Sequence, residues 1–342
     1  MTDTISKRAS LSAVLFLENL PMLAPLVASW VQHGHKIAAI VMADRPNAGL
    51  EWHVERLQGL MAPQWSFPIQ VHRHAPGVPI IRLAAPIKWG RLRKRLAKLD
   101  ADVLISAFFP RRIPESVFSL FRCGGVNLHP ALLPHFRGPS PLLHLLLRDA
   151  WREYGGVTLH RMSPGLDEGA IIATAKMGED EHWLDHPTLH RALAGAMANL
   201  VGNAVPAYCR GEVVAVPQME GDFGWANDDV DVMVERDWTA ERFRRLLLFY
   251  GDFPGVYLPV NEERVRLGAV MKVVGPPTGE PVRERCGTVE FDLRDARVAC
   301  SGMSLRTWWA LVRREWREQR SSFPPAIPFS YAMQVQAEPP TF

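Results

Sequence analysis

Three polar side chains in the middle of the sequence have the types and the spacing to transfer a carbonyl group. Asn127 and His129 end an apolar run, and Asp167 lies in a later turn flanked by glycines. Residues i and i+2 of an extended chain share a face, so Asn127 and His129 can point into one cleft. Asp167 could return to the same cleft. An amide donor, an imidazole and a carboxylate together suit the transfer of a carbonyl group to a nucleophile.

The residues around these three form two motifs, which run from Asn127 to Gly138 and from Gly156 to Gly169. Together they resemble the folate-dependent formyltransferases. That family shares an Asn-x-His motif, a Leu-Leu-Pro-x-x-Arg-Gly loop and a Gly-Val-Thr segment followed by Asp-x-Gly. All three parts stand here in the same order. The resemblance is dense from about Ala101 to Lys176 and weaker outside.

The resemblance implies a donor, an acceptor and three catalytic roles. The donor would be 10-formyltetrahydrofolate and the acceptor a primary amine that attacks the formyl carbon directly. His129 and the side-chain amide of Asn127 would stabilise the tetrahedral oxyanion. Asp167 would orient or charge His129 and help to relay the amine proton. The reaction would need no metal and no covalent enzyme intermediate.

The resemblance also assigns residues to the two substrates. Backbone groups between Phe108 and Ile113 would bind the pterin, although aromatic residues at a strand end are often plain core. The expected folate-binding residues are Phe108, Phe109, Pro110, Arg111, Ile113, Pro164, Gly165 and Leu166. Arg137 and Gly138 would shape the acceptor side, or they would only pack a loop on a helix. Two departures concern the pocket: Glu168 stands where the family has a small residue, and Glu18 to Pro21 lacks the expected glycine.

The pattern around the motifs predicts an open, mostly parallel α/β sheet of Rossmann-like type, which is the formyltransferase fold. Short apolar runs alternate with amphipathic segments, as in such sheets, and ligands bind beyond the carboxyl ends of their strands. The expected strands are Leu11–Leu17, Lys36–Met42, Val78–Leu83, Asp102–Ser106, Gly125–Leu128, Gly156–Arg161 and Ala170–Lys176. The expected helices are Pro21–His33, Glu51–Met61, Trp89–Asp100, Pro114–Arg122, Pro139–Asp149 and Thr188–Cys209.

The remainder of the chain predicts a second, smaller domain. We expect a catalytic domain at 1–211, a linker at 212–237, a β-rich and barrel-like domain at 238–320 and a proline-rich tail at 321–342. Thr239 is a plausible N-cap for a helix that ends near Phe249. Short β-like pieces follow it, at Val256–Pro259, Arg264–Val274, Thr288–Asp292 and Ala296–Cys300.

Composition excludes several classes of protein. The 342 residues are 47% hydrophobic and 22% charged, which is typical of a globular protein. Four separated cysteines favour a reduced, cytoplasmic location, and no apolar run is long enough to cross a membrane. The histidines at positions 72, 74, 182, 186 and 190 lack the partners of a metal site. No glycine-rich loop indicates a dinucleotide or ATP site.

Charge bears on the acceptor. The net charge is +3, and Gly251 to Arg320 holds 12 Lys and Arg against 10 Asp and Glu. Because a tRNA-binding surface should be basic, this balance favours a small-molecule amine, such as an amino-sugar nucleotide. Methionyl-tRNA remains an alternative. Two further hypotheses are a hydrolase of 10-formyltetrahydrofolate and a binding module without activity. Such hydrolases usually carry an N-terminal regulatory domain, for which we expect no room before Leu11, and the intact motif disfavours the binding module.

Overall fold

The computed structural model describes residues 10–43, 66–177, 186–221, 223–227, 231–250, 255–268 and 270–301. Two sequence features lie outside this part: the expected helix 51–61 and the proline-rich tail 321–342. All statements below concern the described residues.

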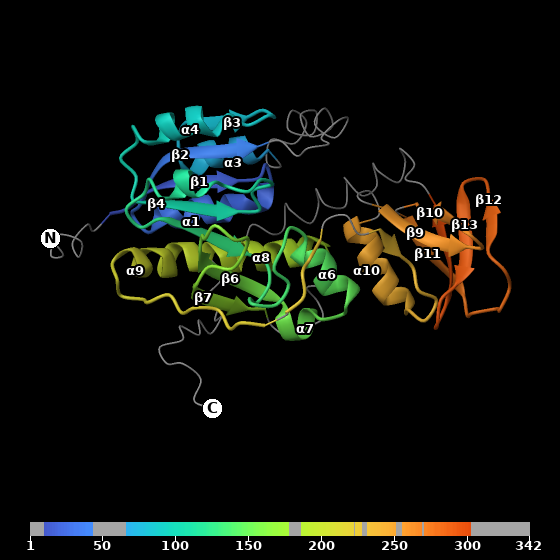
Figure 1. Ribbon diagram of the computed structural model, residues 1–342. Coiled ribbons are helices and arrows are strands. Elements are labelled where there is room, and N and C mark those ends of the chain that lie inside the picture. The colour runs from blue at the N-terminus through green and yellow to red at the C-terminus, as the bar shows by residue number, and fades with distance from the viewer. Residues whose placement is uncertain are drawn as a thin grey trace.

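A seven-stranded sheet forms the centre of the N-terminal part, with strand order β3-β2-β1-β4-β5-β6-β7 (Figure 1). The pairs from β3 to β5 are parallel, whereas β6 runs antiparallel to both β5 and β7. This confirms the predicted fold class. The strands are β1 Ser12–Leu17, β2 Lys36–Ala43, β3 Ile80–Leu83, β4 Val103–Ala107, β5 Gly125–His129, β6 Gly156–Arg161 and β7 Ile171–Lys176.

Helices cover both faces of this sheet because each strand near its centre is apolar on both sides. In β1, Leu15 faces the helices α1, α3 and α8, while Phe16 faces α4 and α5. The helices α1, α4, α5 and α6 are shorter than predicted, and α3 and α7 were not predicted. The helices are α1 Ala24–Gln32, preceded by a 3₁₀ turn at Pro21–Leu23, then α3 Phe67–His74, α4 Trp89–Leu96, α5 Glu115–Phe118, α6 Pro141–Leu147 and α7 Trp151–Tyr154.

The long helix predicted at Thr188–Cys209 is interrupted by a π-helical turn. It consists of α8 His186–Asn199, the π turn Leu200–Ala204 and α9 Val205–Cys209. Pro206 has no amide hydrogen to donate to the carbonyl of Gly202, so a regular α-helix cannot continue there. Gly202 also lies against α1, where a Cβ atom would come within 2.5 Å of His33 and 2.6 Å of Ser29. The irregular turn therefore lets this element pack closely on α1.

The described residues of the C-terminal part, which end at 301, form two sheets. The first has the order β10-β9-β8, with β8 parallel to β9, and the second has the order β11-β14-β13-β12. Thr239 caps α10 as predicted, since its Oγ1 accepts the amide hydrogen of Arg242 at 3.2 Å. The elements are β8 Val232–Met233, α10 Ala240–Tyr250, β9 Val256–Val260, β10 Glu263–Arg266, β11 Val270–Gly275, β12 Arg283–Arg285, β13 Thr288–Asp292 and β14 Arg297–Ser301.

Helix α6 joins the two parts of the molecule. Its Leu143 and Leu146 are buried in the C-terminal core together with Phe243 and Phe291. The rings of these two phenylalanines pack edge to face, with centroids 5.5 Å apart. The domain boundaries predicted at 211 and 238 stay predictions. No helix in the described part of the chain has the length and apolar composition needed to span a bilayer.

The packing of α1 on the sheet gives a prediction for stability. Leu26 is fully buried in the main core. We expect Leu26→Ala to lower the free energy of unfolding by about 2–5 kcal/mol, because the lost methyl groups leave a cavity. Val273→Ala, at a position 52% exposed, should change it by less than about 0.5 kcal/mol. Urea denaturation of both variants checks this, and equal effects would contradict the assigned packing.

Candidate active site

Strand β5 delivers Asn127 and His129 at the point where the sheet changes from parallel to antiparallel. Asn127 pairs with Ser106 of β4 on one side and with His160 of β6 on the other. His129 is buried, and Asn127 is half-buried. Directly opposite residues of an antiparallel pair point to the same face. The register therefore brings a second imidazole, His160, next to the predicted pair.

Asp167 completes the group from the turn after β6. Its carboxylate is buried, and each oxygen has two neighbours. Oδ2 accepts the amide hydrogen of Gly138 at 3.0 Å and lies 3.4 Å from His129 Nδ1. Oδ1 lies 3.4 Å from Asn127 Nδ2 and 3.5 Å from His160 Nε2. The structure thus brings together the three residues that the sequence singled out.

These contacts determine the charge of the site. Burial alone would raise the pKa of Asp167, but the imidazoles of His129 and His160 and the Gly138 amide together hold it below its ordinary value. Burial lowers the pKa of His129 below its ordinary value, although the carboxylate of Asp167 opposes this shift. An ionised Asp167 therefore faces a largely neutral His129 near pH 7.

His129 has two acceptors and, when neutral, only one hydrogen to give. Its Nε2 lies 2.8 Å from the carbonyl oxygen of Phe136, and its Nδ1 faces Asp167. A neutral ring can donate to one of these oxygens, whereas the protonated ring can donate to both. A proton gained by His129 would therefore find a hydrogen-bond acceptor already in place.

His160 is a site residue that the sequence analysis did not assign. Its Nδ1 lies 2.9 Å from the carbonyl oxygen of Arg161, and its Nε2 lies 3.1 Å from Asn127 Nδ2 and 3.5 Å from Asp167 Oδ1. This orients the Asn127 amide with its nitrogen toward Asp167. The sequence did carry a signal for His160, because this residue lies in the second motif, two positions after Gly-Val-Thr. The structure then places it opposite Asn127.

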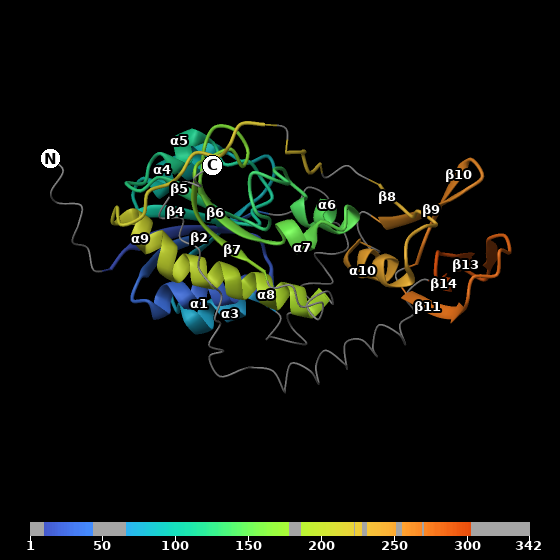
Figure 2. The same ribbon diagram turned by 90° about the horizontal axis from the view of Figure 1, so that it is seen from below.

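The acceptor-side loop is held by a segment that the sequence predicts as a linker. We call residues 216–221 and 223–227 the strap. The amide of Ala226 donates to Arg137 at 2.7 Å, and a Cβ atom on Gly138 would come within 2.7 Å of the carbonyl oxygen of Ala226. Gln218 accepts from Arg137 Nη2 at 2.6 Å. Figure 2 shows the segment in yellow, running from α9 across the molecule toward β8.

The expected folate-binding residues form two neighbouring loops. Phe108 follows β4 with a positive φ of 52°, and Phe109 packs edge to face on Phe16 with ring centroids 5.1 Å apart. Arg112 donates to the carbonyl oxygen of Pro164 and so links the loop after β4 to the turn that carries Gly165 and Leu166. An open hollow of about 220 Å³ lies beside these loops, lined by Ala85, Pro86, Ile87, Trp89, Arg111 and Arg112.

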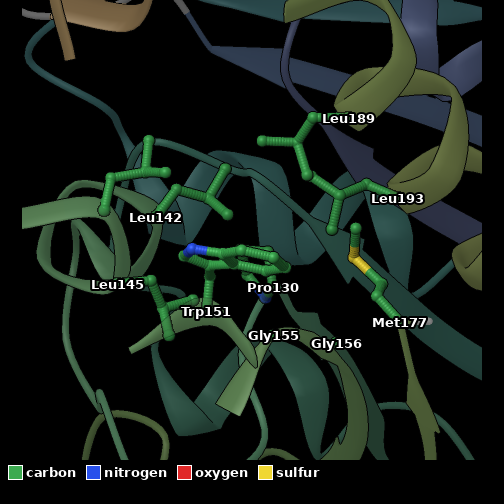
Figure 3. Close-up of a pocket in the computed structure, with 10 residues that line it drawn as sticks. Pro130, Leu142, Leu145, Trp151, Gly155, Gly156, Met177, Leu189 and Leu193 are labelled. Carbon is green, nitrogen blue, oxygen red and sulfur yellow. The ribbon is translucent and has the colours of Figure 1, made fainter. Parts of the chain in front are cut away.

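A second cavity lies between α6, α7 and α8 and is lined by apolar side chains. It has a volume of about 10 Å³ and is lined by Trp151 and by leucines of α6 and α8 (Figure 3). This volume holds at most about one water molecule, so the cavity is a packing defect and not a ligand site. Among the described residues, no group of three His, Cys, Asp or Glu side chains could hold a metal ion.

Comparison with known proteins shows which sequences the chain is similar to. Residues 87–192 match the model of the family described as formyl transferase. This part of the chain, which carries Asn127, His129 and Asp167, is similar to that family. A curated relative, the methionyl-tRNA formyltransferase of Halalkalibacterium halodurans, is 26% identical over 273 residues, which cover 78% of this chain and 81% of the relative.

Two solved structures share the fold. The N-formyltransferase of Helicobacter canadensis, in complex with folinic acid and dTDP-3-aminofucose, has a TM-score of 0.53 at 12% identity, and the match covers 86% of this chain and all of that chain. HypX of Aquifex aeolicus, in complex with tetrahydrofolic acid, has a TM-score of 0.51 at 19% identity. The match covers 84% of this chain but only 43% of HypX, so this chain spans less than half of that protein.

The buried carboxylate gives a prediction for the neighbouring imidazole. We expect Asp167→Asn to lower the pKa of His129 further, because burial continues to disfavour the charged ring while the opposing carboxylate is lost. Titration of the histidine ring signals by NMR in both proteins measures this change. A pKa of His129 that is unchanged or higher in the variant would contradict the assigned contact.

Proposed function

We propose that this protein moves the formyl group of 10-formyltetrahydrofolate to a primary amine by direct attack. The observation that carries the proposal is the cluster of Asn127, His129 and Asp167 at the carboxyl end of β5. These residues are buried against one another, and they occupy the family's motif positions. In open α/β sheets, this edge is where ligands bind.

The reaction balances without a metal or a covalent enzyme intermediate. The lone pair of the neutral amine forms a bond to the formyl carbon, and the electrons of the C=O bond move to oxygen. The tetrahedral intermediate then expels N10 of the folate, which takes up a proton. The products are a formamide and tetrahydrofolate. The enzyme must therefore stabilise an oxyanion and carry one proton from the amine toward N10.

We propose that His129 carries that proton, which requires its Nε2 to turn from the carbonyl oxygen of Phe136 toward the amine. It is largely neutral because burial lowers its pKa, so it can accept a proton near pH 7. Once charged, it donates to both Asp167 and the carbonyl oxygen of Phe136. Asp167 stays ionised because its own pKa is held low, and it compensates the new charge. On the acid side, kcat should therefore fall with a midpoint below the ordinary pKa of an imidazole.

Asn127 would supply the oxyanion donor only after an exchange of partners. Its Nδ2 faces both His160 and Asp167. The contact with Asp167, at 3.4 Å, is the longer and weaker of the two. We propose that the amide turns one hydrogen from Asp167 to the developing oxyanion. A single donor of this kind typically contributes about 2.7–4 kcal/mol to the transition state.

The loops after β4 and before Asp167 would hold the folate. HypX and the Helicobacter canadensis enzyme were solved with tetrahydrofolic acid and folinic acid, respectively, and both share this fold. We propose that backbone groups from Phe108 to Ile113 bind the pterin, with Pro164, Gly165 and Leu166 on the other side. Arg111 and Arg112 line the adjoining hollow, where their charge would suit the carboxylates of the folate.

Two observations support a small-molecule amine as acceptor. Arginines of the C-terminal part are paired with carboxylates of that same part: Arg264 with Asp231, Arg283 with Glu280 at 2.9 Å and Arg297 with Asp292 at 2.9 Å. Paired arginines contribute less to a basic, tRNA-binding surface. The Helicobacter canadensis structure contains dTDP-3-aminofucose, an amino-sugar nucleotide.

Methionyl-tRNA is the second candidate, and the curated relatives support it. The methionyl-tRNA formyltransferase of Halalkalibacterium halodurans matches 78% of this chain, which is more than the predicted catalytic domain alone. A cytoplasmic location suits either acceptor and agrees with four free cysteine thiols.

The catalytic assignment predicts the effect of two substitutions. We expect His129→Ala and Asp167→Ala each to lower kcat by at least about a hundredfold, because each removes a group that carries or compensates the transferred proton. Folinic acid should still raise the Tm of both variants, since their fold and folate loops are intact. Formyl transfer is measured by mass spectrometry of the amine. Near-wild-type turnover in either variant would refute the assignment, and formate release without any acceptor would favour the hydrolase.

The acceptor is identified by direct competition. Methionyl-tRNA and amino-sugar nucleotides are offered to the wild-type enzyme at low and high salt. We expect a small amine to be formylated at a rate that changes little with salt. If methionyl-tRNA is formylated efficiently and the rate falls steeply with added salt, methionyl-tRNA is the acceptor and the small amine is not. The salt dependence is expected because tRNA binding releases counterions.

A further inference from the structure

We propose that Gln218 is a positioning residue that holds the catalytic carboxylate of Asp167 against the acceptor-side loop. Gln218 lies outside residues 87–192, which match the family model, and in a segment that the sequence predicts as a linker. The kinetic part of this inference rests on the proposed function, whereas its structural part does not.

The side-chain amide of Gln218 joins the two loops that build the site. Its Nε2 donates to the carbonyl oxygens of Asp167 and Gly169 at 2.8 and 2.7 Å. Its Oε1 accepts from Nε and Nη2 of Arg137 at 3.0 and 2.6 Å. Both hydrogens of the amide and its oxygen are therefore engaged. One side chain fixes the turn after β6 and the loop after β5 relative to each other.

The Asp167 turn needs such support. Asp167 has a φ of 56°, a left-handed conformation that is unfavourable for a residue with a Cβ atom. Gly169 passes so close to β6 that a Cβ atom would come within 1.7 Å of the carbonyl oxygen of Arg161. A strained and tightly routed turn persists only where its surroundings hold it. Gln218 supplies that hold by binding the carbonyl groups of Asp167 and Gly169.

Gln218 is itself held in place by both ends of the strap. At one end, Val216 and Ile171 of β7 exchange two backbone hydrogen bonds of 2.7 and 2.8 Å. At the other end, Ala226 donates to Arg137 and accepts from the amide of Ser140 at 3.1 Å. The strap therefore spans from the sheet beyond Asp167 to the acceptor-side loop, with Gln218 between the two anchors.

The backbone amide of Gly138 reports on this arrangement without any substrate. It donates to Asp167 Oδ2, so this hydrogen bond protects it from hydrogen exchange while the carboxylate is in place. We expect Gln218→Met, which keeps the size but no hydrogen bond, to speed this exchange at least about tenfold. Gln218→Glu should do the same, because a carboxylate accepts from Arg137 but cannot donate to the two carbonyl groups. Val214→Ala, at an 80% exposed position beside the strap, should leave it unchanged.

Kinetics then separate positioning from simple folding. With an accepted amine, we expect Gln218→Met and Gln218→Glu each to lower kcat about ten- to a hundredfold, because the carboxylate of Asp167 is displaced from His129. The KM for the folate should stay near the wild-type value. Slow Gly138 exchange and normal kcat in both variants would refute the positioning role. So would a Gln218→Glu variant that behaves like wild type, since Arg137 alone would then suffice. If wild type transfers no formyl group but Gly138 exchange still responds to Gln218, the proposed function fails and the structural inference stands.

Discussion

The carboxylate of Asp167 is buried, and a buried charge must be compensated by its neighbours. Here the compensation is spread over an amide hydrogen of the backbone, a side-chain amide and two imidazoles. No single contact is short, since apart from the Gly138 bond all lie between 3.4 and 3.5 Å. A carboxylate held by several moderate contacts can strengthen one of them when a neighbour gains charge. This leaves room for His129 to become protonated during the reaction.

Each of these neighbours comes from a different piece of chain, and the sheet topology brings them together. Asn127 and His129 lie on the last strand of the parallel series, and His160 lies on the first antiparallel one. Because β6 runs antiparallel to β5, its last residue, Arg161, lies opposite Val126 near the start of β5. The turn that follows β6 then brings Asp167 back to within 3.4 Å of His129. The antiparallel pairing thus supplies His160, and the turn after β6 supplies Asp167.

Local patterns predicted most of the fold and the three central residues. The buried strands could be predicted because they are short apolar runs ended by glycine or polar residues. The two motifs singled out Asn127, His129 and Asp167. What the sequence did not reveal depends on pairing over long distances. His160 becomes a neighbour only through the register of β6, and Gln218 only through the path of the chain after α9. Strand β12, which is short and fully polar, and helix α3, which begins Phe-Pro, carry weak local signals.

The strap also bears on how far this enzyme can be divided into modules. A chain that ended at residue 211 would contain every motif residue, yet it would lack the partner of Arg137 and the backbone that lies against Gly138. The same segment continues toward the C-terminal sheets, and α6 places two leucines in their core. Recombination that exchanged the C-terminal part for another domain would therefore have to preserve the strap. A catalytic unit cut at residue 211 would thus lose contacts of its own site.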